Sequence, residues 1–190
     1  TIEKFTLGSS FNSARIQKKL LDNFELKDLI SSGVFNKNQN SKIFFQNRIM
    51  VPINNVQDKT IGFGARVINE SLPKYINTAE TKLFKKKQIL YNESQLDKHS
   101  NKKIILVEGY FDVIKLYQFG FSNCVAPLGT SINHERIIDL TKKGYEIIVC
   151  LDGDLAGRNA SLRLMNNLLS SKDFELGVKF VLLPKNYDPD

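Results

Sequence analysis

The sequence contains little cysteine and little histidine. Its 190 residues include only two cysteines, Cys124 and Cys150, without a CxxC spacing, and two isolated histidines, His99 and His134. Such a set supports neither a zinc site nor a disulfide framework. We interpret both cysteines as small buried residues of a protein in a reducing compartment, and both histidines as surface residues.

Long apolar runs are also absent. No segment approaches the roughly 20 apolar residues that span a bilayer, and the N-terminus lacks the apolar part of a signal peptide. We therefore predict no membrane contact. The chain begins at Thr1 without a methionine and stops at Asp190 within a motif, so we expect a fragment of a longer protein. Its hydrophobic content of 42% supports a folded core.

Charge is distributed unevenly along the chain. Residues 1–103 hold 18 Lys and Arg against 9 Asp and Glu, whereas residues 104–190 hold 9 against 11. A basic half joined to an acidic half favours a polyanion bound by the first and a metal ion bound by the second. A basic surface that only keeps the chain in solution explains the charge equally well, so charge alone leaves both interpretations open.

The first half predicts a mixture of helix and strand. Apolar residues over 11–32 fall near helical spacing, with a cap at residues 11–13 and an end at Gly33. The segments 48–53 and 60–68 predict a β-hairpin, in which Gly62 and Gly64 allow backbone or a ligand to approach closely. We predict that residues 73–88 are irregular and basic and that residues 93–103 form a connector.

From residue 104 the pattern alternates between strand and helix. The expected strands are nearly continuous apolar runs, typical of a sheet covered by helices on both faces. They are 104–107, 123–126, 146–151 and 178–183, and the expected helices are 110–119, 133–142 and 156–170. This alternation predicts a mostly parallel sheet. The fold class is therefore α/β, with a basic mixed subdomain at 1–103 and a metal-binding subdomain with a Rossmann-like sheet at 104–190.

Acidic residues follow the ends of three of these strands. They are Glu108, Asp152, Asp154, Asp188 and Asp190. The carboxyl ends of parallel strands share one edge of the sheet, where ligands bind. Two carboxylates about 4 Å apart repel by roughly 4 kcal/mol at an effective dielectric constant near 20. The pattern therefore predicts a site for a divalent, oxygen-liking cation.

Three nearby features have more than one interpretation. Asp112 is expected in the first turn of a helix, where it either caps that helix or belongs to the site. The segment 188–190 either adds metal ligands or forms a solvated turn. In the loop 127–131, Gly129 and the hydroxyl groups either approach a phosphate or precede a helix that Ser131 or Asn133 caps.

The motifs of the second half resemble those of a known family. EGYFD at 108–112, PLGTS at 127–131 and DGDLAGR at 152–158 resemble, in order and spacing, the Toprim segment of DnaG-type bacterial primases. Upstream, RIMVPI, GFGAR, PKYINTAET and LFKKKQILY resemble the basic N-terminal part of that family's RNA polymerase core. LLPKNYDPD at 182–190 resembles its downstream acidic motif. The resemblance covers nearly the whole chain and is weakest over residues 1–42.

This resemblance implies a DNA-directed RNA polymerase of the bacterial cytoplasm. Such an enzyme makes short RNA primers on single-stranded DNA from ribonucleoside triphosphates, by nucleotidyl transfer that depends on Mg²⁺ or Mn²⁺. The resemblance also implies a zinc site in a missing N-terminal domain and contact with the replicative helicase through a missing C-terminal domain. We expect the fragment itself to be monomeric.

The resemblance also assigns roles to particular residues. The implied catalytic residues are Glu108, Asp112, Asp152 and Asp154. The implied metal ligands are Glu108, Asp152 and Asp154, with Asp188 and Asp190 supporting a further ion. The residues implied to face nucleic acid or nucleotide are Arg48, Arg66, Lys74, Tyr75, Asn77 and Lys86.

Some positions depart from the family pattern, and other functions remain open. Ala65 stands where a second glycine is usual, Leu155 is not the usual residue after the aspartates, and the run 85–87 leaves open which lysine acts. One alternative is another Toprim enzyme, either a nuclease or a topoisomerase. A topoisomerase would need a nucleophilic tyrosine. The other is a non-catalytic module that binds single-stranded DNA and whose acids are only structural.

Overall fold

The structure is a computed structural model that describes residues 1–37, 42–98, 102–129, 132–171 and 177–189. The chain divides into two compact units, Thr1–Lys85 and Lys86–Asp190. None of the helices in the described ranges combines the length and the apolar character needed to cross a membrane.

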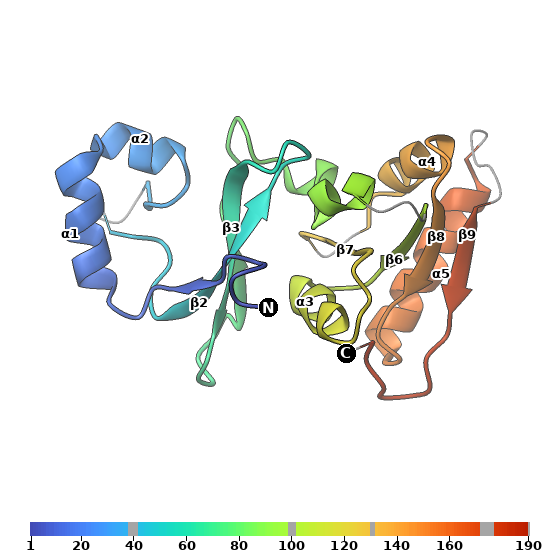
Figure 1. Ribbon diagram of the computed structural model, residues 1–190. Helices are drawn as coiled ribbons and strands as arrows, with labels where there is room; N and C mark the ends of the chain where they lie inside the picture. The colour runs from blue at the N-terminus through green and yellow to red at the C-terminus, as the bar shows by residue number, and fades with distance from the viewer. Residues whose placement is uncertain (38–41, 99–101, 130–131, 172–176, 190) are drawn as a thin grey trace. The chain divides into compact units, whose positions relative to one another are not determined.

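The first unit is built on an antiparallel sheet with the strand order β1-β2-β3-β4, of which Figure 1 labels the two central strands, β2 and β3. Its centre is the predicted hairpin of β2 (Arg48–Asn54) and β3 (Thr60–Val67). β1 (Gly8–Ser9) pairs with β2, and β4 (Tyr75–Asn77) pairs with β3. The prediction of irregular structure was wrong for β4, because three residues are too few to show strand alternation in a sequence.

The predicted helical region forms two helices, α1 (Ser13–Asn23) and α2 (Leu26–Ser31). The backbone of Phe24 is extended between them, which ends α1. The side chain of Asn12 accepts a hydrogen bond from the Arg15 N–H at 3.2 Å and caps α1, as the sequence predicted. Gly33 follows α2 with a φ of 74°, a left-handed conformation that glycine adopts without strain.

A close approach does occur at Gly62 in β3. A Cβ atom at this position would lie 3.2 Å from the ring of Phe84, whose side chain is fully buried. The absence of a side chain at Gly62 therefore makes room for an aromatic ring of the same unit. Val51, Ile53 and Ala65 are also fully buried in this sheet.

The second unit contains a five-stranded sheet with the order β5-β7-β6-β8-β9. Its strands are β5 (Leu90–Tyr91), β6 (Lys103–Leu106), β7 (Cys124–Pro127), β8 (Glu146–Cys150) and β9 (Val178–Val181). β6 pairs in parallel with β7 and β8, and β8 pairs in parallel with β9. The predicted mostly parallel α/β sheet is thus confirmed. The antiparallel edge strand β5 was not predicted, since it has only two residues.

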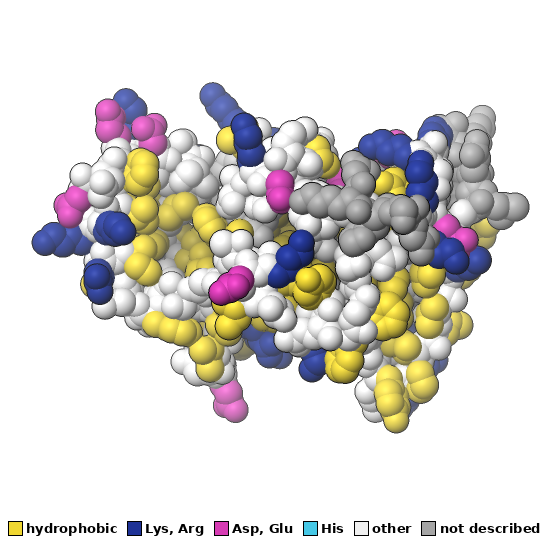
Figure 2. Space-filling model, viewed as in Figure 1, with side chains coloured by type: hydrophobic (Ala, Val, Ile, Leu, Met, Phe, Trp, Pro, Cys, Tyr) yellow, Lys and Arg dark blue, Asp and Glu magenta, His cyan; other side chains and the backbone are white. Residues whose placement is uncertain are grey.

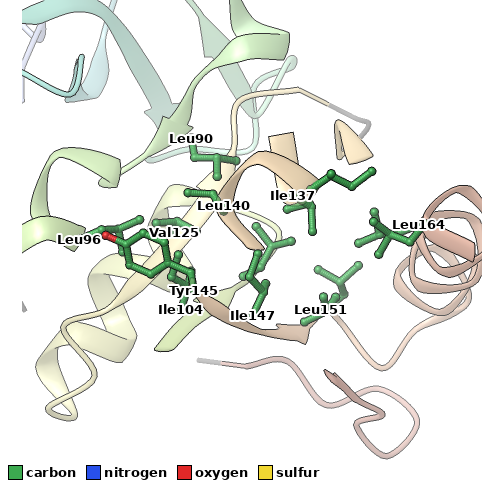
Figure 3. Close-up of a cluster of buried hydrophobic side chains, with 14 residues drawn as sticks. Leu90, Leu96, Ile104, Val125, Ile137, Leu140, Tyr145, Ile147, Leu151 and Leu164 are labelled. Carbon is green, nitrogen blue, oxygen red and sulfur yellow. The ribbon is translucent and has the colours of Figure 1, made fainter. Parts of the chain in front are cut away.

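Helices α3 (Tyr110–Gln118), α4 (His134–Lys142) and α5 (Leu155–Leu169) flank this sheet. Their bounds lie within one residue of the predicted ones. Figure 3 shows Ile137 and Leu140 of α4 and Leu164 of α5 gathered with Ile104 and Ile147 of the sheet. This buried cluster fixes the strands, and therefore the strand ends that carry the acids.

Residues before β6 also belong to the second core. Leu90 of β5 and Leu96 of the 3-10 helix η2 (Glu93–Lys98) are buried in the same cluster as Ile104. A further short 3-10 helix, η1 (Lys86–Gln88), precedes β5. The boundary between the two compact units falls between Lys85 and Lys86 in the sequence. The expected division into domains after residue 103 stays a prediction.

Candidate metal centre and nucleic-acid surface

The acids predicted to converge come from neighbouring strands. Glu108 follows β6, and Asp152 follows β8, its parallel partner in the sheet. The backbone N–H of Asp152 donates a hydrogen bond to Glu108 Oε1 at 3.1 Å. Two strand ends separated by more than 40 residues of sequence are thus joined at one edge of the second unit.

The electrostatics at this edge are dominated by mutual repulsion. Burial, followed by the charges of Glu108, Asp112, Asp188 and Asp154, raises the pKa of Asp152 to about 7. Burial also raises the pKa of Glu108, and the hydrogen bond from the Asp152 N–H only partly opposes this rise. Since each of these shifts marks an unfavourable charged form, the edge is short of positive charge.

Two of the acids also cap helices. Asp154 Oδ1 accepts a hydrogen bond from the Gly157 N–H at 2.7 Å at the start of α5, and Asp112 Oδ2 accepts one from the Gly109 N–H at 2.7 Å. The capping interpretation of Asp112 is therefore confirmed, and its catalytic role stays a prediction. A carboxylate has two oxygens, so capping leaves Asp154 a second oxygen with which to bind a ligand.

Two glycines allow the chain to pack this closely. A Cβ atom on Gly157 would collide with the Asp152 carbonyl oxygen and would lie 2.6 Å from Glu108 Oε1. A Cβ atom on Gly153 would collide with the Pro184 carbonyl oxygen. The Gly153 N–H also donates to the Tyr187 carbonyl oxygen at 2.8 Å. Gly153 therefore holds the segment that leads to Asp188.

The donor chemistry of the edge fits Mg²⁺ or Mn²⁺. Its side-chain donors are carboxylate oxygens, which these hard cations prefer, and a divalent ion would relieve the repulsion that raises the pKa of Asp152. Within the described ranges, no three His, Cys, Asp or Glu residues already stand in the arrangement of a metal cluster. The predicted ligand Asp190 lies outside the described residues.

The loop after β7 is only partly described. Its Thr130 and Ser131 lie outside the described residues, so the predicted phosphate contact there stays a prediction. The Asn133 side chain accepts a hydrogen bond from the Glu135 N–H at 3.0 Å and caps α4. One of the two capping residues that the sequence offered is thus confirmed.

In the first unit, three predicted nucleic-acid residues lie together: Arg66 on β3, Tyr75 on β4, and Lys74 directly before β4. Arg66 pairs with Tyr75 in the strand register, and its guanidinium lies 5.4 Å from the centre of the Tyr75 ring. The Lys74 ammonium lies 5.7 Å from the same ring. Tyr75 is 45% exposed, so an aromatic ring with two cations close to it is accessible to solvent. Such a group suits both a nucleobase and a phosphate.

The other predicted residues have different surroundings. Arg48 is only 8% exposed, and its guanidinium donates to the Pro73 carbonyl oxygen at 2.9 Å. This contact braces the segment that leads to Lys74. Asn77 is half-buried on β4, and Lys86 belongs to the second unit. On the face seen in Figure 2, Lys and Arg side chains are scattered rather than gathered in one patch, so the local cluster is more informative than the net charge.

The first unit also contains a cavity of about 1120 Å³ between the end of α2, the start of β3 and residues 79–83. None of the predicted nucleic-acid residues lines it. Gly157 and Arg158 had no predicted role, although both lie in the motif at 152–158. Glycine is unfavourable in a helix. A glycine in the first turn of the expected helix was therefore the available signal that position 157 is closely packed.

A mostly parallel sheet with an acidic edge is the arrangement of a Toprim domain, and in this chain it follows a basic antiparallel unit. Residues 102–179 match the Toprim domain family, and residues 1–97 match the N-terminal domain of the DNA primase catalytic core. The chain therefore belongs to the DNA primase catalytic core family.

Individual relatives agree with this assignment. The DNA primase of Rickettsia felis is 44% identical over 195 residues, and that of Haemophilus influenzae is 36% identical. Each alignment covers 100% of this chain but 33% of the relative, so the chain spans about a third of their length.

Solved structures show the same fold. The Aquifex aeolicus primase, with its zinc-binding and RNA polymerase domains, superposes with a TM-score of 0.86 at 34% identity, over 99% of this chain and 47% of that one. A DnaG primase catalytic domain bound to single-stranded DNA superposes with a TM-score of 0.85 at 32% identity, over 99% and 61%.

Proposed function

We propose that this chain is the central catalytic part of a bacterial DNA primase, a DNA-directed RNA polymerase that makes short RNA primers on single-stranded DNA. The observation that carries the proposal is the acidic edge, where four neighbouring carboxylates and burial raise the pKa of Asp152 to about 7. A binding module would gain nothing from this unfavourable cluster. An enzyme that uses a divalent cation needs such a cluster.

Glu108, Asp152 and Asp154 would hold Mg²⁺ or Mn²⁺, with Asp188 and Asp190 available for a further ion. When bound, such an ion stabilises negative charge on the attacking and leaving oxygens of nucleotidyl transfer. Gly157 lets Glu108 lie against the start of α5, so that Glu108 and Asp154 approach the same volume. Asp112 adds negative charge at this edge, because its carboxylate also raises the pKa of Asp152.

The basic and aromatic residues would position the template and the nucleotides. Arg66 and Lys74 would hold phosphates, and the exposed ring of Tyr75 would stack on a base. Lys86 and Asn77 would add contacts of the same kind. Arg48 would act mainly by supporting the backbone next to Lys74, to which its guanidinium donates a further hydrogen bond at 3.4 Å.

The substrates in this proposal are single-stranded DNA and ribonucleoside triphosphates. The structural neighbour that was solved with single-stranded DNA supports the first of these. A zinc-binding domain and a helicase-binding domain would belong to other parts of the longer protein. We expect the chain itself to act as a monomer in the bacterial cytoplasm.

A topoisomerase, one of the rival Toprim activities, needs a reactive tyrosine. Tyr75 and Tyr187 are exposed and stay candidates for it, whereas Tyr91 and Tyr110 are buried, and burial raises the pKa of the Tyr91 hydroxyl. A buried phenol with a raised pKa is a poor nucleophile. The non-catalytic DNA-binding module is the alternative that an activity measurement must separate from the proposal.

The test is primer synthesis from labelled ribonucleoside triphosphates on single-stranded DNA, with Mg²⁺ or Mn²⁺, by a longer protein that contains this chain. We expect RNA products from the unmodified protein and none from Asp152→Asn or Asp154→Asn, with DNA binding retained. Asp139→Asn, on the exposed side of α4, is the matched control. RNA products from both site variants would refute the metal role, and DNA binding without any product would favour the non-catalytic module.

A further inference from the structure

Arg158, in the first turn of α5, contacts two separate segments at the acidic edge. Its Nε donates to the Gly153 carbonyl oxygen at 3.2 Å, and its Nη2 donates to the Leu183 carbonyl oxygen at 3.3 Å. One guanidinium therefore joins the turn that carries Asp152 and Asp154 to the segment that leads from β9 to Asp188. Neither the family resemblance nor the predicted sites gave this residue a role.

The two joined segments also touch each other directly. The Gly153 N–H donates to the Tyr187 carbonyl oxygen at 2.8 Å, and a Cβ atom on Gly153 would collide with the Pro184 carbonyl oxygen. The Tyr187 N–H in turn donates to the Pro184 carbonyl oxygen at 3.2 Å. Asp188 is the next residue after this tethered turn, so the tether determines where its carboxylate lies.

The charge of Arg158 does not explain its position. Among the described residues Arg158 forms no ion pair with a carboxylate. Arg158 binds carbonyl oxygens and leaves the carboxylates available to a cation.

We propose that Arg158 is a positioning residue that holds the segment 183–188 against Gly153 and so brings Asp188 to the metal-binding edge. The planar guanidinium presents donors in two directions at once, which a lysine ammonium on a flexible stem does not reproduce. The inference rests on the proposed metal-dependent function, because it assigns Asp188 to the same ion-binding edge as Asp152.

The test compares Arg158→Ala and Arg158→Lys with the unmodified chain. Mn²⁺ binding is measured by calorimetry, and the exchange rate of the Gly153 amide hydrogen is measured by NMR. We expect both variants to bind Mn²⁺ about tenfold more weakly, as for other residues that orient metal ligands. We expect the Gly153 amide to exchange about fivefold faster, because its bond to Tyr187 loses support.

Arg163→Ala is the matched control, since Arg163 is an exposed arginine on the same helix. Arg158 is itself exposed, so its replacement leaves the core intact, which circular dichroism checks. Unchanged Mn²⁺ affinity and unchanged Gly153 exchange in Arg158→Ala would overturn the proposal. Full Mn²⁺ affinity in Arg158→Lys would overturn it too, because charge and not geometry would then matter.

The same measurements separate this inference from the proposed function. If the unmodified chain binds no Mn²⁺ at all, the proposed metal function fails. The positioning role is then judged from Gly153 exchange alone. Faster exchange in Arg158→Ala upholds the tether, and unchanged exchange refutes it.

Discussion

The Asp152 backbone N–H donates to Glu108 Oε1 across the junction of β6 and β8, with 3.1 Å between the two atoms. This bond orients the Glu108 side chain before any cation arrives. It also lowers the pKa of Glu108 against the larger effect of burial. The backbone of Asp152 thus holds the Glu108 side chain. The unfavourable charge at this edge is expressed mainly in the raised pKa of the Asp152 carboxylate.

Asp152→Asn should stabilise the chain at alkaline pH in the absence of metal. The folded-state pKa of Asp152 is raised to about 7, above its unfolded value, so its ionisation destabilises the fold increasingly as pH rises from about 4 to 7. Allowing for partial exposure, we expect a gain of about 1–2 kcal/mol at pH 8 that shrinks towards pH 4. Urea unfolding in EDTA at several pH values measures it.

Addition of Mg²⁺ should reverse this order at pH 8. A cation that binds only the folded chain stabilises it in proportion to its affinity, and the amide of the variant is a weaker ligand than the carboxylate. The unmodified chain should therefore become the more stable of the two. An equal response of both proteins to Mg²⁺ would contradict a metal role for Asp152.

Asp154 should show two separable roles. Asp154→Ala removes both the cap of α5 and the charge, whereas Asp154→Asn keeps a capping side chain. We expect about 1 kcal/mol lower stability for the alanine variant and little change for asparagine. Both should lose Mn²⁺ binding, measured by calorimetry. If asparagine retained full Mn²⁺ affinity, Asp154 would be only a helix cap.

Gly157→Ala should disturb the site from within the helix. Alanine usually stabilises a helix, but here its Cβ would collide with the Asp152 carbonyl and crowd Glu108. We expect a loss of about 1–3 kcal/mol in unfolding free energy and weaker Mn²⁺ binding. Gly129→Ala is the control, because a Cβ there meets nothing within 4 Å. Normal stability in Gly157→Ala would mean that the strand ends separate more easily than the geometry indicates.

The sequence predicted the parallel sheet and its acidic edge well, because buried strands leave long apolar runs and the acids follow them directly. It did not predict β4 and β5, whose two or three residues carry no periodic signal. It also missed Arg158, since its contacts depend on how the segment after β9 folds back onto Gly153. Arg158 bonds to the backbone carbonyl of Leu183, which every residue type has. The sequence therefore gives no signal of this contact at position 183.

Lys74 and Tyr75 should contribute to DNA binding in different ways. Lys74→Ala removes a phosphate contact, so the slope of log affinity against log salt should fall by about 0.7 for single-stranded DNA. Tyr75→Ala removes a stacking surface, so affinity should fall by about 1–3 kcal/mol with the slope unchanged. Fluorescence anisotropy over a salt series measures both. Lys59→Ala, in the exposed hairpin turn, is the control, and matching losses in all three variants would contradict a defined surface.

Arg48→Ala should reduce stability more than it reduces DNA contact. The side chain is nearly buried and donates to the carbonyl oxygens of Pro73 and Lys74. Its removal takes this donor from the Pro73 carbonyl oxygen, whereas the Lys74 carbonyl oxygen keeps the bond from the Val67 N–H. We expect about 1–3 kcal/mol lower unfolding free energy, against less than about 0.5 kcal/mol for Arg66→Ala on the neighbouring strand. Because Arg48 supports the backbone at Lys74, its loss should weaken DNA binding while the salt slope stays nearly constant. A stable Arg48→Ala variant whose salt slope falls as far as that of Lys74→Ala would instead make Arg48 a direct phosphate ligand.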